Sequence, residues 1–135
     1  MRVLIIDDDP ILIMVCSRLM NITGFSQTIS SSRDGKEGFD QFKLVMETMP
    51  DNLPDLILLD INMPVMNGWD FLDLYAGIED QIPKKICIVM LSSTVDQADY
   101  DKANSYTQVN GFYSKPLSKE NLPDIAALVG LQYGS

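Results

Sequence analysis

The sequence contains no histidine, and this absence removes several kinds of chemistry at once. Catalysis by Ser-His-Asp or Cys-His groups is excluded, and so is any metal site built on imidazole. A metal ion would have to be held by oxygen ligands. Cysteine is almost as scarce: Cys16 and Cys87 lie among apolar residues and form no CxxC motif, which favours small buried thiols in a reducing compartment over a disulfide.

Basic residues and long apolar runs are also lacking. Lys and Arg number 10 against 19 Asp and Glu, and the net charge of -9 argues against a nucleic-acid surface, which needs clustered basic side chains. No apolar run approaches the roughly 18 residues of a membrane span, and the chain opens into a strand-like run rather than a secretory signal. The sequence therefore predicts a cytoplasmic chain that contacts neither nucleic acid nor a membrane.

What is present is a set of short apolar runs. With 135 residues, 46% of them hydrophobic, the chain fits a single domain over residues 1–135 with a substantial core. The runs lack alternation, which is typical of strands buried on both faces of a parallel sheet, and the segments between them have helical spacing, which indicates five βα units. The expected strands are residues 3–6, 56–59, 86–91, a weaker 111–113 and a candidate edge strand at 26–31.

Capping residues and apolar positions predict the helices. The first helix is expected from Pro10, capped by Asp9, to Gly24, the second over 35–49, the third from Asn67 or Gly68, and the fourth over 95–106. The fourth helix is so polar that we expect it to pack weakly and to be able to shift. The expected apolar positions are Ile11, Met14, Val15 and Leu19, then Phe39, Phe42 and Met46, then Phe71, Leu72 and Leu74, and finally Ala98 and Ala103.

The start of the fifth helix is ambiguous. Ser118 is a good cap, but Pro123 stands late for a first turn. Either the helix begins nearer Leu122 or it is locally distorted.

Polar side chains stand where the predicted strands end. Asp7, Asp8 and Asp9 follow the first strand. Asp60 follows the third strand, Ser92 and Ser93 the fourth, and Lys115 and Pro116 the fifth. Ligands of an open parallel sheet bind beyond the carboxyl ends of the strands, so we expect these tips to converge on one face.

The converging residue types fit phosphoryl transfer to an acid. Crowded carboxylates need a cation or a raised pKa, and oxygen ligands without His or Cys favour Mg²⁺. A carboxylate is also a nucleophile that forms an aspartyl phosphate. Taken singly, Asp60 fits a turn residue, Ser92 a strand-end hydroxyl and Lys115 a solvated lysine. Their joint occurrence at successive strand tips favours the functional interpretation.

Four segments together resemble a known family, the response-regulator receiver domain. They are residues 5–10 (IIDDDP), 58–64 (LLDINMP) followed by Asn67 and Gly68, 91–93 (LSS) and 112–116 (FYSKP). The resemblance covers nearly the whole chain. It implies an α/β, flavodoxin-like (βα)5 three-layer sandwich with a five-stranded parallel sheet in the order 2-1-3-4-5.

The resemblance also implies residue roles. Asp60 matches the phosphoacceptor, Asp7 and Asp8 match the acidic pair that organises Mg²⁺ with Asp60, and the backbone carbonyl of Asn62 matches a further ligand. Lys115 matches the lysine that contacts the phosphoryl group. The remaining matches are Ser92 with the switch hydroxyl, Pro116 with a cis-proline junction, and Phe112 with the aromatic that reports the state, although an ordinary core ring fits Phe112 equally well.

The implied function is a signalling switch of a two-component phosphorelay rather than an enzyme. A histidine kinase or histidine phosphotransfer protein would supply the phosphoryl group, and an unknown protein target would read the face formed by the fourth helix, fifth strand and fifth helix. The chain departs from the family in its long stretch over residues 43–53 and in having Ser where Thr often stands at position 92.

Two other functions stay open. A small haloacid-dehalogenase-like phosphatase also has Asp-x-Asp after its first strand, but Ile11 stands where that family has Thr or Val, no acidic pair follows Lys115, and Asp60 would have no role. A degenerate receiver would bind partners without phosphorylation. Its usual sign is loss of an acidic, acceptor or lysine residue, and none is missing here.

Overall fold

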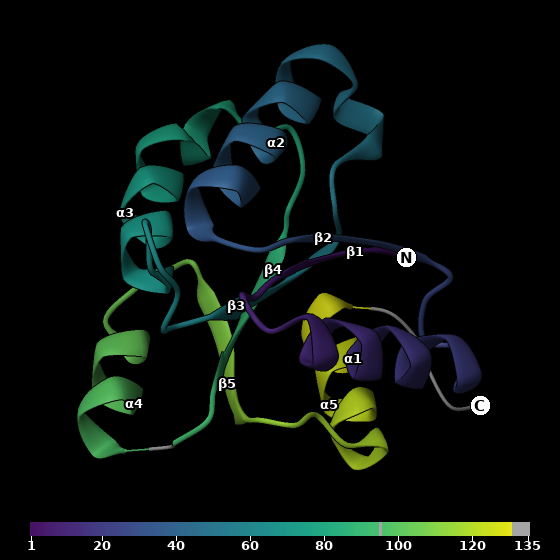
Figure 1. The fold of residues 1–135 in the computed structure, drawn as a ribbon. Coiled ribbons are helices and arrows are strands. Elements are labelled where there is room, and N and C mark those ends of the chain that lie inside the picture. The colour runs from purple at the N-terminus through teal and green to yellow at the C-terminus, as the bar shows by residue number, and fades with distance from the viewer. Residues whose placement is uncertain (95, 131–135) are drawn as a thin grey trace.

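The structure, a computed structural model, describes residues 1–94 and 96–130 (Figure 1). The described residues contain a sheet of five parallel strands in the order β2-β1-β3-β4-β5, which confirms the flavodoxin-like order implied by the resemblance. The strands are β1 (Arg2–Ile6), β2 (Thr28–Ser32), β3 (Leu56–Asp60), β4 (Cys87–Ser92) and β5 (Val109–Ser114).

Helices cover both faces of this sheet. Figure 1 shows α1 and α5 on one side and α2, α3 and α4 on the other. The bounds are α1 (Pro10–Ile22), α2 (Gly35–Thr48), α3 (Gly68–Ile78), α4 (Gln97–Asn104) and α5 (Leu122–Val129). None of the helices in the described part of the chain has the length and apolar character to cross a membrane. The predicted start of the fourth helix, Val95, lies outside the described residues.

The central strands are buried on both faces, as their continuous apolar runs predicted. Along β1, Leu4 and Ile6 pack toward α2 and α3, whereas Val3 and Ile5 pack toward α1 and α5. The same alternation in β3 and β4 divides the core into two apolar layers. Cys16 and Cys87 are both buried in the layer under α1 and α5, as predicted, and burial raises the pKa of each thiol to about 11.

Local capping sets where the helices begin. Asp9 accepts a hydrogen bond from the amide of Ile11 (2.9 Å) with Pro10 in the first turn, and Asn67 and Asp70 form a capping box at the start of α3. The ambiguity at the fifth helix is resolved by a short 3₁₀ turn, η3 (Lys119–Asn121), so that α5 itself begins at Leu122.

Three predicted helix faces were wrong in part. Ile11, Met14 and Val15 are exposed, and α1 instead buries Leu12, Cys16 and Met20, while Leu19 is partly buried. Residues 11–16 are all apolar, so the sequence pattern does not distinguish the inner face from the outer one. In α3 Leu74 is exposed and Tyr75 is buried, and in α4 Ala98 is exposed and Ala103 is buried.

The C-terminal end of the polar helix α4, together with the segment that follows it, packs against α3. The rings of Trp69 and Tyr106 stack with centroids 5.9 Å apart, and the Lys102 ammonium lies 4.8 Å from the centre of the Trp69 ring. The hydroxyl of Tyr106 donates a hydrogen bond to Asp73 (2.9 Å). These contacts compensate for the small apolar surface of α4.

Candidate functional site

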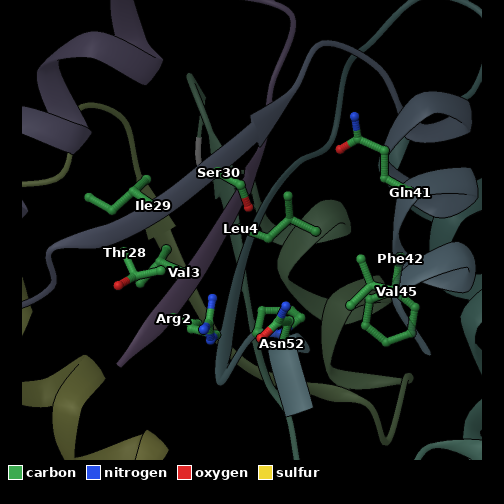
Figure 2. A pocket seen from close by; sticks show the side chains of 11 residues that line it. Arg2, Val3, Leu4, Thr28, Ile29, Ser30, Gln41, Phe42, Val45 and Asn52 are labelled. Atoms are coloured by element: carbon green, nitrogen blue, oxygen red, sulfur yellow. The ribbon is translucent and has the colours of Figure 1, made fainter. Parts of the chain in front are cut away.

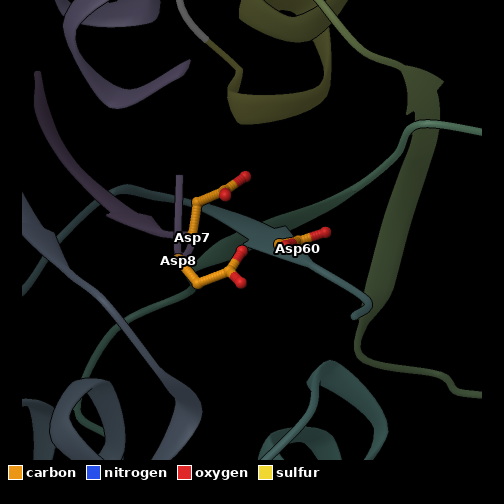
Figure 3. Close-up of side chains that lie close together, drawn as sticks. All are labelled: Asp7, Asp8 and Asp60. Atoms are coloured by element: carbon orange, nitrogen blue, oxygen red, sulfur yellow. The ribbon is translucent and has the colours of Figure 1, made fainter. Parts of the chain in front are cut away.

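The predicted convergence of strand tips is confirmed. Asp7 directly follows β1, Asp60 ends β3, Ser92 ends β4 and Lys115 directly follows β5. In the register of the sheet, Ile6 pairs with Leu59, and this places the two aspartates beside each other at the carboxyl edge. Figure 3 shows Asp7, Asp8 and Asp60 close together at this edge.

The three carboxylates form a compact acidic cluster. One oxygen from each of Asp7, Asp8 and Asp60 lies within 4.8 Å of the others. Asp7 and Asp60 are buried, whereas Asp8 is exposed. Burial raises the pKa of Asp60 to about 6, with the negative charge of Asp7 adding to the effect, and burial likewise raises the pKa of Asp7.

Lys115 bridges the two buried aspartates. Its Nζ lies 2.8 Å from Asp7 Oδ2 and 2.9 Å from Asp60 Oδ1. Burial alone would lower the pKa of this ammonium, but its hydrogen bonds to Asp7 and Asp60 raise the pKa overall. Lys115 therefore stays charged at neutral pH and partly offsets the repulsion between the carboxylates.

The donor set fits a hard divalent cation. Asp7 Oδ1 accepts a hydrogen bond from the amide of Asp9 (2.9 Å), but within residues 1–94 and 96–130 Asp7 Oδ2 has the Lys115 ammonium and no other donor. Three carboxylates against one ammonium leave an excess of negative charge. Oxygen ligands with such an excess suit Mg²⁺, which binds one or two carboxylates and keeps several waters.

Asn62 lies beside this cluster on the loop after β3. Its side chain is exposed, and its amide is 3.4 Å from Asp60 Oδ1, at the long end of hydrogen-bond distances. The backbone carbonyl of Asn62 as a metal ligand stays a prediction.

Ser92 ends β4 at the predicted edge, whereas Phe112 lies inside β5 opposite Met90, and within the described residues neither is hydrogen-bonded to Asp60. The Ser92 hydroxyl donates to the carbonyl of Thr94 and accepts from the Thr94 amide (3.2 Å). Phe112 is half-buried, and its ring packs edge-on to Tyr100. The peptide bond between Lys115 and Pro116 is cis, as the resemblance implied.

The shape of the loop over residues 61–67 was not predicted from the sequence. Val65, which is exposed, has a φ of +68°, a left-handed conformation that β-branched residues rarely adopt. The Met66 amide donates to the Pro64 carbonyl (2.7 Å), so Val65 is the central residue of a tight turn. No sequence signal predicts this conformation, because valine disfavours it.

A small apolar pocket lies away from the acidic cluster. Its volume is about 140 Å³, and it opens between β1, β2 and α2 (Figure 2). The lining includes Arg2 at the beginning of β1, with Leu4, Ser30, Phe42 and Val45. Because Arg2 and Asp7 stand at opposite ends of β1, this pocket does not belong to the candidate site.

Comparison with known proteins identifies the family. The family model described as "Response regulator receiver domain" matches residues 3–127. The chain belongs to this family. Membership places this receiver domain in two-component signalling, where receiver domains interact with histidine kinases and downstream effectors, and it disfavours the haloacid-dehalogenase interpretation.

Individual relatives agree with this assignment. The receiver domain is 31% identical over 120 residues to the probable methanogenesis regulatory protein FilR2 of Methanothrix harundinacea, covering 89% of this chain and 75% of FilR2. It is 30% identical over 95 residues to the transcriptional regulatory protein PrrA of Mycobacterium tuberculosis, covering 70% of this chain but 36% of PrrA. The chain thus spans about a third of the length of PrrA.

A solved structure shows the same architecture. It is a two-component response regulator from Cytophaga hutchinsonii, with a TM-score of 0.87, 30% sequence identity and coverage of 95% of both chains. The acidic cluster of the present receiver domain is consistent with the Mg²⁺ pocket typical of such domains.

Proposed function

We propose that this receiver domain is a phosphoacceptor switch that takes a phosphoryl group onto Asp60 and thereby changes its binding to a partner protein. The observation that carries the proposal is the buried carboxylate of Asp60 at the sheet edge, sharing the Lys115 ammonium with Asp7. A nucleophile, a fixed cation and neighbouring metal-ligand oxygens are thus held at one point. These are the parts that phosphoryl transfer to an acid requires.

In the proposed step, a carboxylate oxygen of Asp60 attacks phosphorus. The new bond is an acyl phosphate, and the bond from phosphorus to the donor breaks, with its electron pair leaving on the donor's imidazole nitrogen or carboxylate oxygen. Asp60 must be ionised to attack, and its pKa of about 6 leaves it mostly ionised at neutral pH. Lys115 then pairs with a phosphoryl oxygen while keeping its proton.

Asp7, Asp8, Asp60 and the backbone carbonyl of Asn62 are the proposed ligands of Mg²⁺. When bound, the ion neutralises charge on the phosphoryl oxygens. The proposed need for a cation is supported by charge, since an anionic donor would otherwise approach three carboxylates on a chain with a net charge of -9.

The proposed donor is a histidine kinase or a histidine phosphotransfer protein, because the chain has no histidine of its own. The proposed output surface is the face of α4, β5 and α5. A shallow cavity of about 380 Å³ lies on this face, lined by residues that include Tyr100, Phe112, Asp124 and Leu128. We place the protein in the cytoplasm, as a signalling component rather than an enzyme.

The proposal is tested by phosphorylating the purified protein with acetyl phosphate and Mg²⁺. Intact mass should increase by one phosphoryl group, and EDTA should prevent the increase. The Asp60→Asn variant should not be labelled. Undiminished labelling in that variant contradicts the assignment, and label found on Asp7 would support a phosphatase mechanism instead. A folded wild-type protein that takes no label would favour a degenerate receiver.

A further inference from the structure

The loop that follows Asp60 contains a residue with a strained backbone conformation. Residues 61–67 connect β3 to α3, and the turn at Pro64, Val65 and Met66 places a β-branched residue at a φ of +68°. Such a conformation is strained and persists only where surrounding contacts hold it. The contacts that hold this loop therefore determine where Asn62 lies.

The first of these contacts is at the base of the loop. The amide of Gly68 donates to the carbonyl of Ile61 (2.9 Å), which closes the loop on itself. A Cβ atom at Gly68 would lie 2.4 Å from the carbonyl oxygen of Asp60, so only glycine fits there. This contact involves only the loop and α3, the helix that directly follows it.

The second contact comes from a different element, the first residue of α2. The amide of Gly35 donates to the carbonyl of Met66 (3.1 Å), immediately after the strained Val65. A Cβ atom at Gly35 would lie 2.6 Å from that carbonyl oxygen and 3.0 Å from Met66 Cγ. The obstacle is backbone rather than the end of a flexible side chain, so either the loop or α2 would have to move.

We propose that Gly35 is a positioning residue for the phosphoacceptor site, although it is not part of the acidic cluster. By letting α2 approach Met66, it fixes the loop on which Asn62 stands beside Asp60, with the Asn62 amide 3.4 Å from Asp60 Oδ1. The inference rests on the proposed function, because it assigns Gly35 a role in Mg²⁺ binding and phosphorylation at that site.

The test compares three glycine-to-alanine variants. Gly35→Ala should weaken Mg²⁺ binding and slow labelling by acetyl phosphate, each by about tenfold, the lower range seen when residues supporting metal ligands are changed. Gly77→Ala, in α3, is the matched surface control, because its Cβ would meet nothing within 4 Å. It should leave both measurements unchanged.

Gly38→Ala separates positioning from stability. Its Cβ would lie 2.7 Å from Ile6 Cδ1 and 3.0 Å from Ile6 Cγ1, so the obstacle is a buried core side chain and not the backbone of the loop over residues 61–67. This variant should lower the melting temperature while keeping the wild-type Mg²⁺ affinity. A merely structural role for Gly35 would make the Gly35→Ala variant behave in the same way.

A measurement on the wild-type protein guards against a Gly35→Ala variant that does not fold. In an NMR titration with Mg²⁺, the amide resonance of Gly35 should shift, whereas that of Gly77 should not. Wild-type affinity and labelling in folded Gly35→Ala, or an unshifted Gly35 amide, would overturn the inference. Absence of labelling in the wild-type protein would instead overturn the proposed function.

Discussion

The ring of Phe112 packs edge-on against the ring of Tyr100, with the two centroids 6.0 Å apart. This contact joins β5 to α4, a helix in which Ala103 is the residue whose side chain is buried. Because α4 offers so little apolar surface, two packings of this helix within a few kcal/mol of each other are physically reasonable. The Phe112 and Tyr100 rings form one contact through which β5 would affect the choice between these two packings.

Phosphorylation should therefore change the protection of backbone amides on this face against hydrogen exchange. A phosphoryl group on Asp60 offers the Ser92 hydroxyl a stronger acceptor than the Thr94 carbonyl that it now uses. Hydrogen exchange with and without beryllofluoride, which stands in for the phosphoryl group, should change over residues 93–117. The change should be smaller in Ser92→Ala. Changes confined to residues 7–9 and 60–67 would mean that the site binds phosphate without transmitting the signal.

The metal-free protein should lose stability as the pH rises from about 4 to about 6. The pKa of Asp60 is raised to about 6 in the folded state, so the folded state binds this proton more tightly than the unfolded state. The resulting stabilisation is complete below the pKa that Asp60 has in the unfolded protein, and it is lost as the pH passes the pKa that Asp60 has in the folded protein. Urea unfolding in EDTA across this window measures the effect.

Asp60→Asn is the matched variant for this pH dependence. It should be more stable than the wild type in EDTA at pH 7, on the order of 1–3 kcal/mol, and its pH dependence should be flatter. Mg²⁺ favours the ionised carboxylates, so saturating Mg²⁺ should reduce the loss of stability that the wild type shows as the pH rises. Identical pH profiles for the two proteins would contradict the raised pKa of Asp60.

Loss of the Lys115 ammonium should lower the free energy of unfolding at pH values where Asp60 is charged. Lys115→Met leaves two buried carboxylates without their shared cation, a change of the kind that typically costs about 3–5 kcal/mol. The loss should be large at pH 8 and smaller at pH 5, where Asp60 is mostly protonated. Thermal unfolding in EDTA tests this, with the exposed Lys119→Met as control. An equal loss at both pH values would argue that Lys115 acts through packing.

Relief of the backbone strain at Val65 should stabilise the protein. Asparagine tolerates a left-handed conformation far better than valine does, and the Val65 side chain is exposed, so little burial is lost. Val65→Asn should raise the free energy of unfolding by about 1 kcal/mol. Urea denaturation measures the gain, and Val65→Ile, which keeps the β-branch, should show none.

The sheet could be predicted from the sequence because its strands carry their own signal. Continuous apolar runs such as β3 are typical of strands buried on both faces, as in a parallel sheet between helices. The inner face of α1 could not be predicted in the same way. Six consecutive apolar residues, 11–16, satisfy several helical stripes equally, and only contacts with the sheet and α5 select Leu12 and Cys16 over Ile11 and Val15.

The acidic cluster was predictable for a similar reason. Residues that follow parallel strands share one edge of the sheet, and the long side chain of Lys115 reaches Asp7 and Asp60 along that edge. The contact between Gly35 and Met66 was not predictable. It joins segments that are far apart in the chain, and it depends on a left-handed Val65 that local propensity opposes.

The stacking of Trp69 on Tyr106 also has a spectroscopic consequence. Trp69 is the chain's one tryptophan, so all indole fluorescence originates where α3 meets α4. The Lys102 ammonium and the Tyr106 ring lie against the indole and belong to the end of α4 and the segment that follows it. Any displacement of that end changes the polarity around the indole and its access to collisional quenchers. The tryptophan fluorescence of the unlabelled protein therefore reports on the separation of these two helices.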